Sequence, residues 1–317
     1  MGFVDGRVVV VTGAGRGIGR AHALAFAAEG AHVVVNDIGT GPANEVVDEI
    51  TSAGGEAVVN DDDIADWDGA SSLIQTAVDT FGGLDVLVNN AGFIRGSDLA
   101  DTSEAEWDAV IRVHLKGHFT MLRHAAQYWR GQTTLGAAVD ARIINTSSAG
   151  GLQGSAGQGN YSAAKAGIAA LTLVAAAELG RYGVTVNAIA PSARTRMTEA
   201  VFTDMTARPD NGFDPMAPQN ISPLVVWLGS DKSRDITGRV FEIEGGLIRV
   251  AEGWRTARRP TKAPAGTPPR WARSSPTYWP NRDHRYPSTA RKPLHRIATV
   301  PQRATFPNPS LATKETP

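Results

Sequence analysis

The residues best suited to chemistry are Tyr161 and Lys165, four positions apart in the stretch NYSAAKAG. On a helix this spacing puts both side chains on one face. An isolated tyrosine has a pKa of about 10 and is a poor base at neutral pH. A neighbouring lysine cation stabilises the phenolate, so Tyr161 could remove a proton from a hydroxyl group or return it. The same spacing also occurs in ordinary amphipathic helices, so the pair needs support from other motifs.

A glycine-rich stretch, TGAGRGIG, follows an apolar run near the start of the chain. A strand-to-helix turn of this kind lets the backbone approach a pyrophosphate, and the helix N-terminus favours the anion. A tight turn without a ligand is the alternative. The position between a strand and a helix favours cofactor binding.

These motifs lie in an alternation of apolar β-branched runs and alanine-rich helical stretches. Strands are expected at 7–13, 31–37, 56–63, 84–92, 141–148, 184–191 and 238–246, and helices at 19–30, 43–54, 67–82 and 102–129. Ser103 and Glu106 form a capping-box pattern at the start of the last of these helices. Near-continuous apolar strands indicate a parallel sheet covered on both faces. We therefore expect an α/β fold, a single doubly wound Rossmann-type sheet of about seven strands.

Composition limits the class of protein further. The chain of 317 residues has no cysteine, which excludes disulfides and thiolate metal sites. No signal peptide and no uninterrupted apolar segment of about 20 residues is visible, so a cytoplasmic protein without a membrane partner is expected. The run Asp61-Asp62-Asp63 lacks spaced partner ligands, and no metal site is predicted there.

Over residues 7–250 the chain resembles the short-chain dehydrogenase/reductase family. The resemblance rests on four motifs in order: the glycine loop, NNAG at 89–92, Tyr161-x-x-x-Lys165, and VNAIAP at 186–191. It implies NAD(P)-dependent, reversible oxidation of a secondary alcohol to a ketone. The cofactor-binding residues that it implies are Thr12, Gly13, Gly15, Arg16, Gly17, Ile18, Gly19, Asp37, Asp63, Ile64, Asn90, Ala91, Gly92, Tyr161, Lys165, Pro191 and Ser192.

Two further catalytic positions follow from the resemblance. The family's serine hydrogen-bonds the substrate oxygen, and its usual separation from the tyrosine indicates Ser148. Ser147 would point to the opposite face of an extended strand and is interpreted as structural. His114 stands where many members have an asparagine associated with a helix distortion and a water relay to the lysine. Its charge could titrate near neutrality, and a buried structural histidine is the alternative. His118 and His124 are interpreted as structural.

Asp37 favours NAD over NADP. A carboxylate at the end of the second strand can accept hydrogen bonds from both adenosine ribose hydroxyls and would repel a 2′-phosphate. No arginine is adjacent to it in VVVNDIGTG. A turn-capping role is the alternative. By resemblance, Asp63 and Ile64 contact the adenine.

Several stretches, among them RVHLKGHF and PSARTRMTEAV, are most similar to the dehydrogenase domain of peroxisomal D-bifunctional proteins and its bacterial relatives. That resemblance implies a 3-hydroxyacyl-CoA or a hydroxysteroid as the alcohol substrate, with residues 197–223 as a substrate lid. An NADPH-dependent 3-oxoacyl carrier-protein reductase shares the fold and catalytic residues, but Asp37 disfavours it. A non-catalytic Rossmann protein would not need Ser148, Tyr161 and Lys165.

The helix from Tyr161 carries small apolar side chains on more than one face. It must therefore bury more than one stripe, which indicates packing against another subunit. A homo-oligomer, a dimer or a tetramer, is expected, and the family resemblance favours the tetramer.

Residues 255–317 differ sharply from the rest. They hold 13 basic and 2 acidic residues and 12 of the 18 prolines, a net charge of +11 against −12 for residues 1–254. A mostly disordered tail is expected after a dehydrogenase domain at 1–254. Nucleic-acid binding through the basic residues is disfavoured but stays open. A third interpretation is an out-of-frame product, because codons permitted by AGTPPRWA at 265–272 can encode the WDPAALG segment of relatives in another frame.

Overall fold

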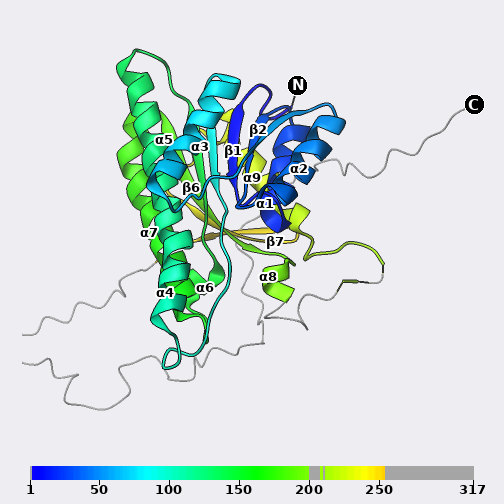
Figure 1. Cartoon of the computed structure of the whole chain (residues 1–317), viewed down its shortest axis with the longest axis vertical. Helices are drawn as coiled ribbons and strands as arrows, with labels where there is room; N and C mark the ends of the chain where they lie inside the picture. Colours follow the sequence, from blue (N-terminus) through cyan, green and yellow to red (C-terminus); the bar gives the residue numbers. More distant parts are fainter. Residues whose placement is uncertain (1, 200–207, 210, 254–317) are drawn as a thin grey trace, which may run out of the picture. The chain divides into compact units, whose positions relative to one another are not determined.

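The computed structural model describes residues 2–199, 208–209 and 211–253 of the chain. The predicted tail at 255–317 lies outside these ranges, as do residues 200–207 and 210 of the predicted lid. The domain boundary near residue 254 and the disorder of the tail therefore stay predictions. Figure 1 shows the described residues in colour along the sequence.

The core of the fold is an eight-stranded sheet in the order β3-β2-β1-β4-β5-β6-β7-β8. The strands are β1 (Val8–Thr12), β2 (His32–Asn36), β3 (Glu56–Asn60), β4 (Val86–Asn89), β5 (Ala141–Thr146), β6 (Val184–Ser192), β7 (Val240–Glu244) and β8 (Leu247–Ala251). All neighbours pair in parallel except β7 and β8, which are antiparallel. The doubly wound α/β fold is thus confirmed, with one strand more than predicted.

Helices cover both faces of this sheet (Figure 1). Their bounds are α1 (Gly17–Ala28), α2 (Thr40–Ser52), α3 (Trp67–Phe81), α4 (Glu104–Ile111), α5 (Gly117–Thr134), α6 (Ala149–Gln153), α7 (Gly159–Leu179), α8 (Arg196–Glu199) and α9 (Ser222–Gly229). The 3-10 turns are η2 (Gly180–Tyr182), η4 (Pro218–Ile221) and η5 (Asp231–Ser233). Side chains of α1, α2 and α9 form one apolar layer, and those of α3, α5 and α7 form the other.

The alternation along β1 shows why one strand serves both layers. Val9 and Val11 belong to the layer of α1 and α9, whereas Val8 and Val10 belong to the layer of α3 and α5. Successive side chains of a strand point to opposite faces, so a strand that is apolar at every position must be covered twice. This arrangement leaves the carboxyl ends of β1, β4, β5 and β6 at one edge of the sheet, where ligands bind in such folds.

The predicted helix at 102–129 is interrupted. Its start is confirmed, because Ser103 and Glu106 form the capping box of α4. Residues Arg112–Lys116 then form a π-helix, η1, before the α-helical pattern resumes in α5. Such single-turn insertions disturb the regular hydrogen-bond ladder and often mark functional sites. This one contains His114.

The helical stretch Gly159–Tyr182 is long and apolar enough to cross a membrane. Among the described residues it is the only helix that meets these two criteria. It packs against β5 and β6 and carries Tyr161 and Lys165. We therefore interpret it as a core helix of the fold.

Candidate active site

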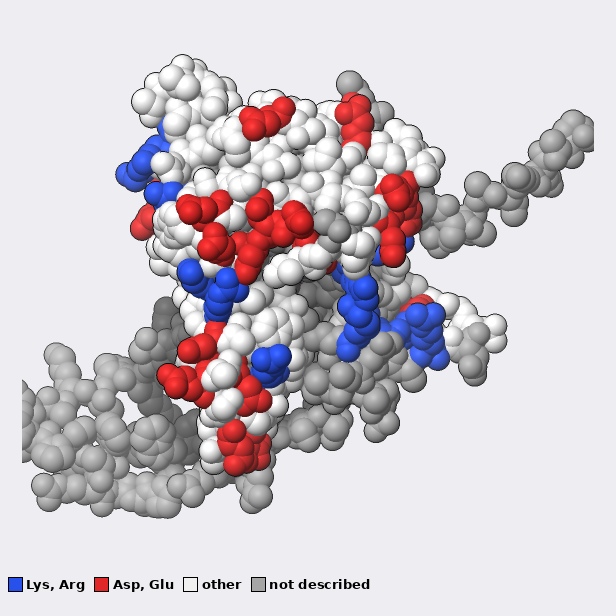
Figure 2. All heavy atoms as spheres, in the orientation of Figure 1, with Lys and Arg blue, Asp and Glu red and all other residues white. Residues whose placement is uncertain are grey.

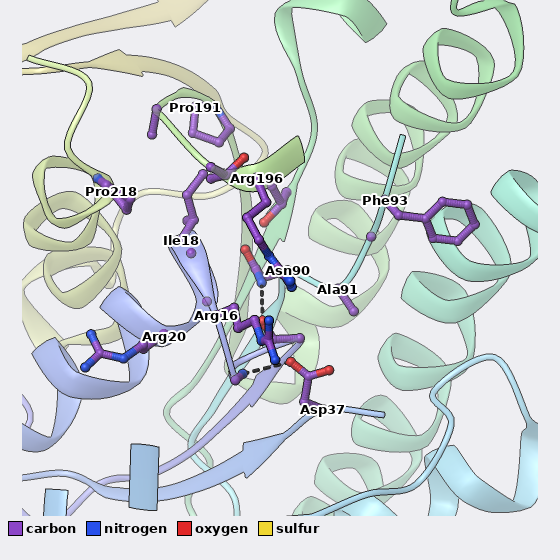
Figure 3. A pocket seen from close by; sticks show the side chains of 18 of the residues that line it. Arg16, Ile18, Arg20, Asp37, Asn90, Ala91, Phe93, Pro191, Arg196 and Pro218 are labelled. Carbon is purple, nitrogen blue, oxygen red and sulfur yellow. Dashed lines mark hydrogen bonds between the residues drawn. The ribbon is translucent and has the colours of Figure 1, made fainter. Parts of the chain in front are cut away.

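A cavity of about 1250 Å³ opens at the carboxyl ends of the central strands (Figure 3). The predicted site residues that line it are Gly13, Gly15, Arg16, Gly17, Ile18, Gly19, Asp37, Asp63, Ile64, Asn90, Ala91, Gly92, His114, Tyr161, Lys165 and Pro191. Residues that follow β1, β2, β3 and β4 are thus brought together with residues of α7. Thr12, Ser148 and Ser192 are not part of the lining, whereas Ser147 is.

Thr12 and Asn90 brace the glycine loop from behind. The Asn90 Nδ2 group donates to the carbonyl oxygens of Thr12 at 2.9 Å and of Gly13 at 3.1 Å. The Thr12 hydroxyl accepts hydrogen bonds from the backbone N–H groups of Asn90 at 3.0 Å and Ala91 at 3.1 Å. Thr12 is fully buried. These contacts hold the loop against the end of β4, and Thr12 acts as a brace behind the cavity wall.

The loop has room for a dinucleotide because its glycines lack side chains. A Cβ at Gly19 would lie 2.2 Å from the Gly13 carbonyl oxygen, and one at Gly17 would lie 3.3 Å from Thr195 on the opposite wall. Gly13 and Gly17 also have positive φ angles of 61° and 55°. The bare backbone at the start of α1 therefore fits the diphosphate of a nicotinamide dinucleotide.

Asp37 follows β2 and reaches back to this loop. Its Oδ2 accepts a hydrogen bond from Gly15 N at 2.9 Å, and the residue is half-buried. The close-up in Figure 3 shows its carboxylate beside the loop. The other carboxylate oxygen is not used in this contact. The residue can therefore position the loop and still accept a hydrogen bond from a ligand.

Asp63 and Ile64 form the floor beyond β3. Asp63 Oδ1 accepts from Ala65 N at 2.8 Å, and its Oδ2 pairs with the Arg112 guanidinium at 2.7 Å. Ile64 is buried against Gly117. In the described residues no three His, Cys, Asp or Glu side chains are grouped so that they could hold a metal ion.

Tyr161 and Lys165 lie one turn apart at the start of α7. Lys165 Nζ donates to the Thr146 carbonyl oxygen at 2.6 Å and lies 5.6 Å from the centre of the Tyr161 ring. Burial lowers the pKa of Lys165 to about 7. Burial raises the pKa of Tyr161, and a hydrogen bond with Ser148 partly offsets this.

The pKa of Tyr161 thus departs in the opposite direction from the one expected from Lys165 alone. Desolvation penalises the phenolate more than the hydrogen bond from Ser148 stabilises it. The protein by itself keeps the proton on Tyr161. A further positive charge beside the ring would be needed to make the tyrosine a base in the oxidation direction.

The two serines after β5 have different contacts. Ser147 is buried, and its hydroxyl donates to the Lys165 carbonyl oxygen at 2.8 Å, which ties α7 to the sheet. Ser148 caps α6, accepts from Gly150 N at 3.1 Å and hydrogen-bonds Tyr161. Ser148 is therefore the serine that faces the tyrosine. Its contact with a substrate stays a prediction.

His114 sits inside η1 and closes the wall next to Tyr161. Its Nε2 lies 2.6 Å from the Phe93 carbonyl oxygen, and its ring stands edge-on to the Tyr161 ring at a centroid distance of 5.3 Å. Burial, with a smaller effect from Lys165, lowers its pKa to about 3. The hypothesis that its charge titrates near neutrality is therefore wrong, because the ring stays neutral in this apolar setting.

The other two histidines that were predicted to be structural, His118 and His124, lie outside the cavity lining. His118 is buried one turn beyond His114, and burial keeps its pKa well below the usual value. His124 packs edge-on against Trp67 at a centroid distance of 4.9 Å.

Gly92 provides a direct test of this wall. A Cβ there would lie 2.2 Å from Cε1 of His114, so Gly92→Ala must displace the ring. We expect it to lower the free energy of unfolding by about 1–3 kcal/mol and to reduce turnover. Gly131→Ala in α5 is the matched control, because its Cβ would meet nothing within 4 Å. Urea unfolding of both variants measures the difference, and equal stabilities would contradict the packing described for His114.

Sequence reasoning missed the wall formed by Arg194, Thr195 and Arg196, whereas Arg208, which also lines the cavity, lies within the predicted lid at 197–223. The segment follows β6 directly, and its position after a strand end was the available signal. Its arginines reach the cavity through contacts with residues far along the chain, which the local pattern does not show.

The comparisons with known proteins agree with this geometry. The family model for short chain dehydrogenases matches residues 7–206. Hydroxyacyl-CoA dehydrogenase ChsB1 of Mycobacterium tuberculosis is 47% identical over 81% of this chain and 83% of its own length. Peroxisomal multifunctional enzyme type 2 of Mus musculus is 42% identical over 79% of this chain, but the match spans 32% of that enzyme.

A reductase and a solved structure are also similar to this chain. A 3-oxoacyl-[acyl-carrier-protein] reductase of Synechocystis is 40% identical over 78% of this chain and 99% of its own. The crystal structure of a short chain dehydrogenase from Mycobacterium avium superposes with a TM-score of 0.76, at 67% identity, over 82% of this chain and 90% of that one. The fold, the cavity and these matches agree, and the chain belongs to the short-chain dehydrogenase/reductase family.

Proposed function

We propose that this oxidoreductase uses NAD to oxidise the hydroxyl group of a 3-hydroxyacyl-CoA, reversibly, to the ketone. Members of the family act on CH–OH groups with NAD(P). The NAD preference and the substrate are the new parts of the proposal. The observation that carries it is that Tyr161 and Lys165 line the same cavity as the glycine loop, with Ser148 hydrogen-bonded to Tyr161 behind the lining.

A bound nicotinamide dinucleotide supplies the hydride acceptor. The residues of this chain then have separate tasks at the hydroxyl group. Ser148 donates a hydrogen bond to the substrate oxygen, and Tyr161 takes the hydroxyl proton in oxidation and returns it in reduction. Lys165, fixed by the Thr146 carbonyl, places a positive charge next to the tyrosine when its amine is protonated. His114 and Phe93 close the wall behind the ring.

Two observations support an acyl-CoA substrate over the alternatives. The relative with 47% identity carries the name hydroxyacyl-CoA dehydrogenase, and the Asp37 carboxylate beside the glycine loop favours NAD over the NADPH of the carrier-protein reductase. The carrier-protein reductase remains the second candidate because one such relative matches over nearly its whole length. A hydroxysteroid is the third substrate class.

A substrate panel tests the proposal. NAD-linked oxidation is measured for 3-hydroxyacyl-CoAs of several chain lengths, for hydroxysteroids, and in reverse for 3-oxoacyl carrier protein with NADPH. We expect the highest kcat/KM for a 3-hydroxyacyl-CoA with NAD. A higher kcat/KM for the carrier-protein substrate would refute the proposal.

Asp37 should determine the cofactor. We expect wild type to prefer NAD over NADP in kcat/KM, and Asp37→Ser to reduce that preference by at least about tenfold, because the repelling carboxylate is removed. Asp62→Ser is the matched control on the same side of the cavity. An NADP preference in the wild type would contradict the role given to Asp37.

We also propose a homo-oligomer in the cytoplasm. Leu173 and Val174 of α7 are 55% and 52% exposed, and Leu247, Ile248 and Val250 of β8 are about half exposed. Apolar surface of this kind is covered in most soluble proteins. The lack of cysteine suits a reducing compartment. Light scattering at micromolar concentration is expected to give the mass of a dimer or a tetramer. The mass of a monomer would contradict the proposed homo-oligomer.

A further inference from the structure

The wall after β6 is held firmly by an ion pair. Arg194 is buried and pairs with Asp214, while its backbone N–H donates to the Met216 carbonyl oxygen at 2.6 Å. The next turn is closed by Thr198, whose hydroxyl donates to the Ala193 carbonyl oxygen at 2.9 Å and accepts from Thr195 N at 2.8 Å. Arg196 projects from this fixed turn into the cavity (Figure 3).

The cavity lining contains both acidic and basic side chains, including Arg16 and Arg20 near the glycine loop and Asp214 beside Arg194. Asp37, Glu45 and Asp62 lie on the side of β2, α2 and β3. Arg196 and Arg208 lie on the opposite wall and are both exposed. On the face shown in Figure 2, basic side chains stand on either side of a central hollow.

Most of the other basic groups of the cavity have partners. Arg194 pairs with Asp214, Arg20 with Glu49, and Lys165 with the Thr146 carbonyl. Arg196 and Arg208 make no ion pair with any acidic side chain of the described residues. Two guanidinium groups without a counter-charge line one wall of a cavity that already has a phosphate cradle on its other side. They are available to an anionic ligand.

We propose that Arg196 and Arg208 form a subsite for the phosphate groups of a coenzyme A thioester. The inference rests on the proposed function, because it assigns the anion to the substrate. The bare backbone at the start of α1 already provides for the diphosphate of the dinucleotide. Guanidinium groups bind phosphate through paired, charge-assisted hydrogen bonds, so this wall selects phosphorylated carriers over the bare acyl chain.

The first experiment compares two substrates that differ only in the carrier. Oxidation of 3-hydroxybutyryl-CoA and of 3-hydroxybutyryl-N-acetylcysteamine, which lacks phosphate, is measured at saturating NAD. For Arg196→Gln and Arg208→Gln, kcat/KM for the CoA thioester should fall about tenfold. The value for the truncated thioester should stay within about twofold, because that substrate has no phosphate for the guanidinium groups to bind. Arg130→Gln, on an exposed position of α5, is the control and should change neither value.

Equal losses of kcat/KM with both thioesters would overturn the proposal. They would mean that the arginines shape the site and do not bind the phosphate groups. A raised KM for NAD with an unchanged ratio between the two thioesters would also overturn it. That result would assign the arginines to the diphosphate of the dinucleotide.

A binding experiment separates this subsite from the proposed function. Coenzyme A is titrated calorimetrically into the full chain saturated with NADH. Wild type should bind it, and each variant should bind about tenfold more weakly, because each substitution removes one guanidinium group that donates charge-assisted hydrogen bonds to phosphate. Failure of wild type to bind coenzyme A would overturn the subsite. Binding without oxidation of any hydroxyacyl thioester would refute the proposed function and leave the subsite in place.

Discussion

Replacing Tyr161 by phenylalanine is expected to remove nearly all turnover while NAD still binds. The substitution takes away only the hydroxyl group that exchanges a proton with the substrate. Loss of general acid–base help costs about 10²–10⁴-fold in rate, and more where one group acts in concert with others. The phenyl ring fills the same space beside His114 and Lys165, so the cavity keeps its shape.

The measurement is kcat under conditions where hydride transfer limits the rate, established by a deuterium isotope effect on the alcohol. Tyr182→Phe is the matched control, because Tyr182 lies in η2 at the far end of α7. Cofactor affinity is followed separately by NADH fluorescence. A variant that retains more than about a tenth of wild-type kcat would contradict the role of Tyr161.

The sheet was the most predictable part of the molecule. Runs such as VVVVT in β1 are apolar at nearly every position, and only a strand covered on both faces suits that pattern. The strand that sequence reasoning missed, β8, has the opposite character. Its five residues LIRVA are largely exposed, and it pairs with β7 only across a turn at Gly245, where φ is 55°. An exposed edge strand lacks the burial that makes a strand visible in a sequence.

The π-helix in the predicted helix 102–129 could not be read from local pattern. The apolar spacing on either side of it is ordinary for an α-helix, and its propensities do not distinguish the two forms. Its residue His114 contacts the backbone of Phe93, 21 residues away, and packs on Gly92. Tertiary contacts of this kind decide between helix types.

Electrostatics at the site were also only partly predictable. The sequence places Lys165 next to Tyr161 and so predicts a lowered tyrosine pKa, but burial of both groups reverses the direction for the tyrosine. The wall with Arg196 was missed for a similar reason, since it depends on the ion pair between Arg194 and Asp214, 20 residues apart. Spacing predicts which groups are neighbours, whereas burial decides their charge.

Lys165→Met is expected to stabilise the protein at pH 6 while it lowers turnover by at least about 100-fold. Lys165 is 3% exposed, and burial lowers its pKa from 10.5 to about 7. The folded state therefore carries a desolvation cost for the ammonium, for which the displaced pKa sets an upper bound of about 5 kcal/mol. Loss of the hydrogen bond to Thr146 offsets part of the gain, so we expect about 2 kcal/mol at pH 6.

The sign of the pH dependence follows from the two states. Below pH 7 both the folded and the unfolded chain carry the Lys165 proton, so the cost in the folded state is complete. Between pH 7 and pH 10.5 the folded chain has lost that proton while the unfolded chain retains it, so the stability of wild type rises with pH relative to the variant. The advantage of Lys165→Met should therefore shrink between pH 6 and pH 9, which are two conditions chosen on either side of about pH 7.

Urea unfolding of the cofactor-free protein at these two pH values measures the effect. Lys232→Met, at a side chain that is 62% exposed, is the control and should show no pH-dependent gain. A destabilised Lys165→Met at pH 6, or a gain that does not change with pH, would mean that the ammonium is well compensated in the folded state. The outcome expected here instead means that the fold carries a destabilising buried cation at this position because the reaction requires its charge.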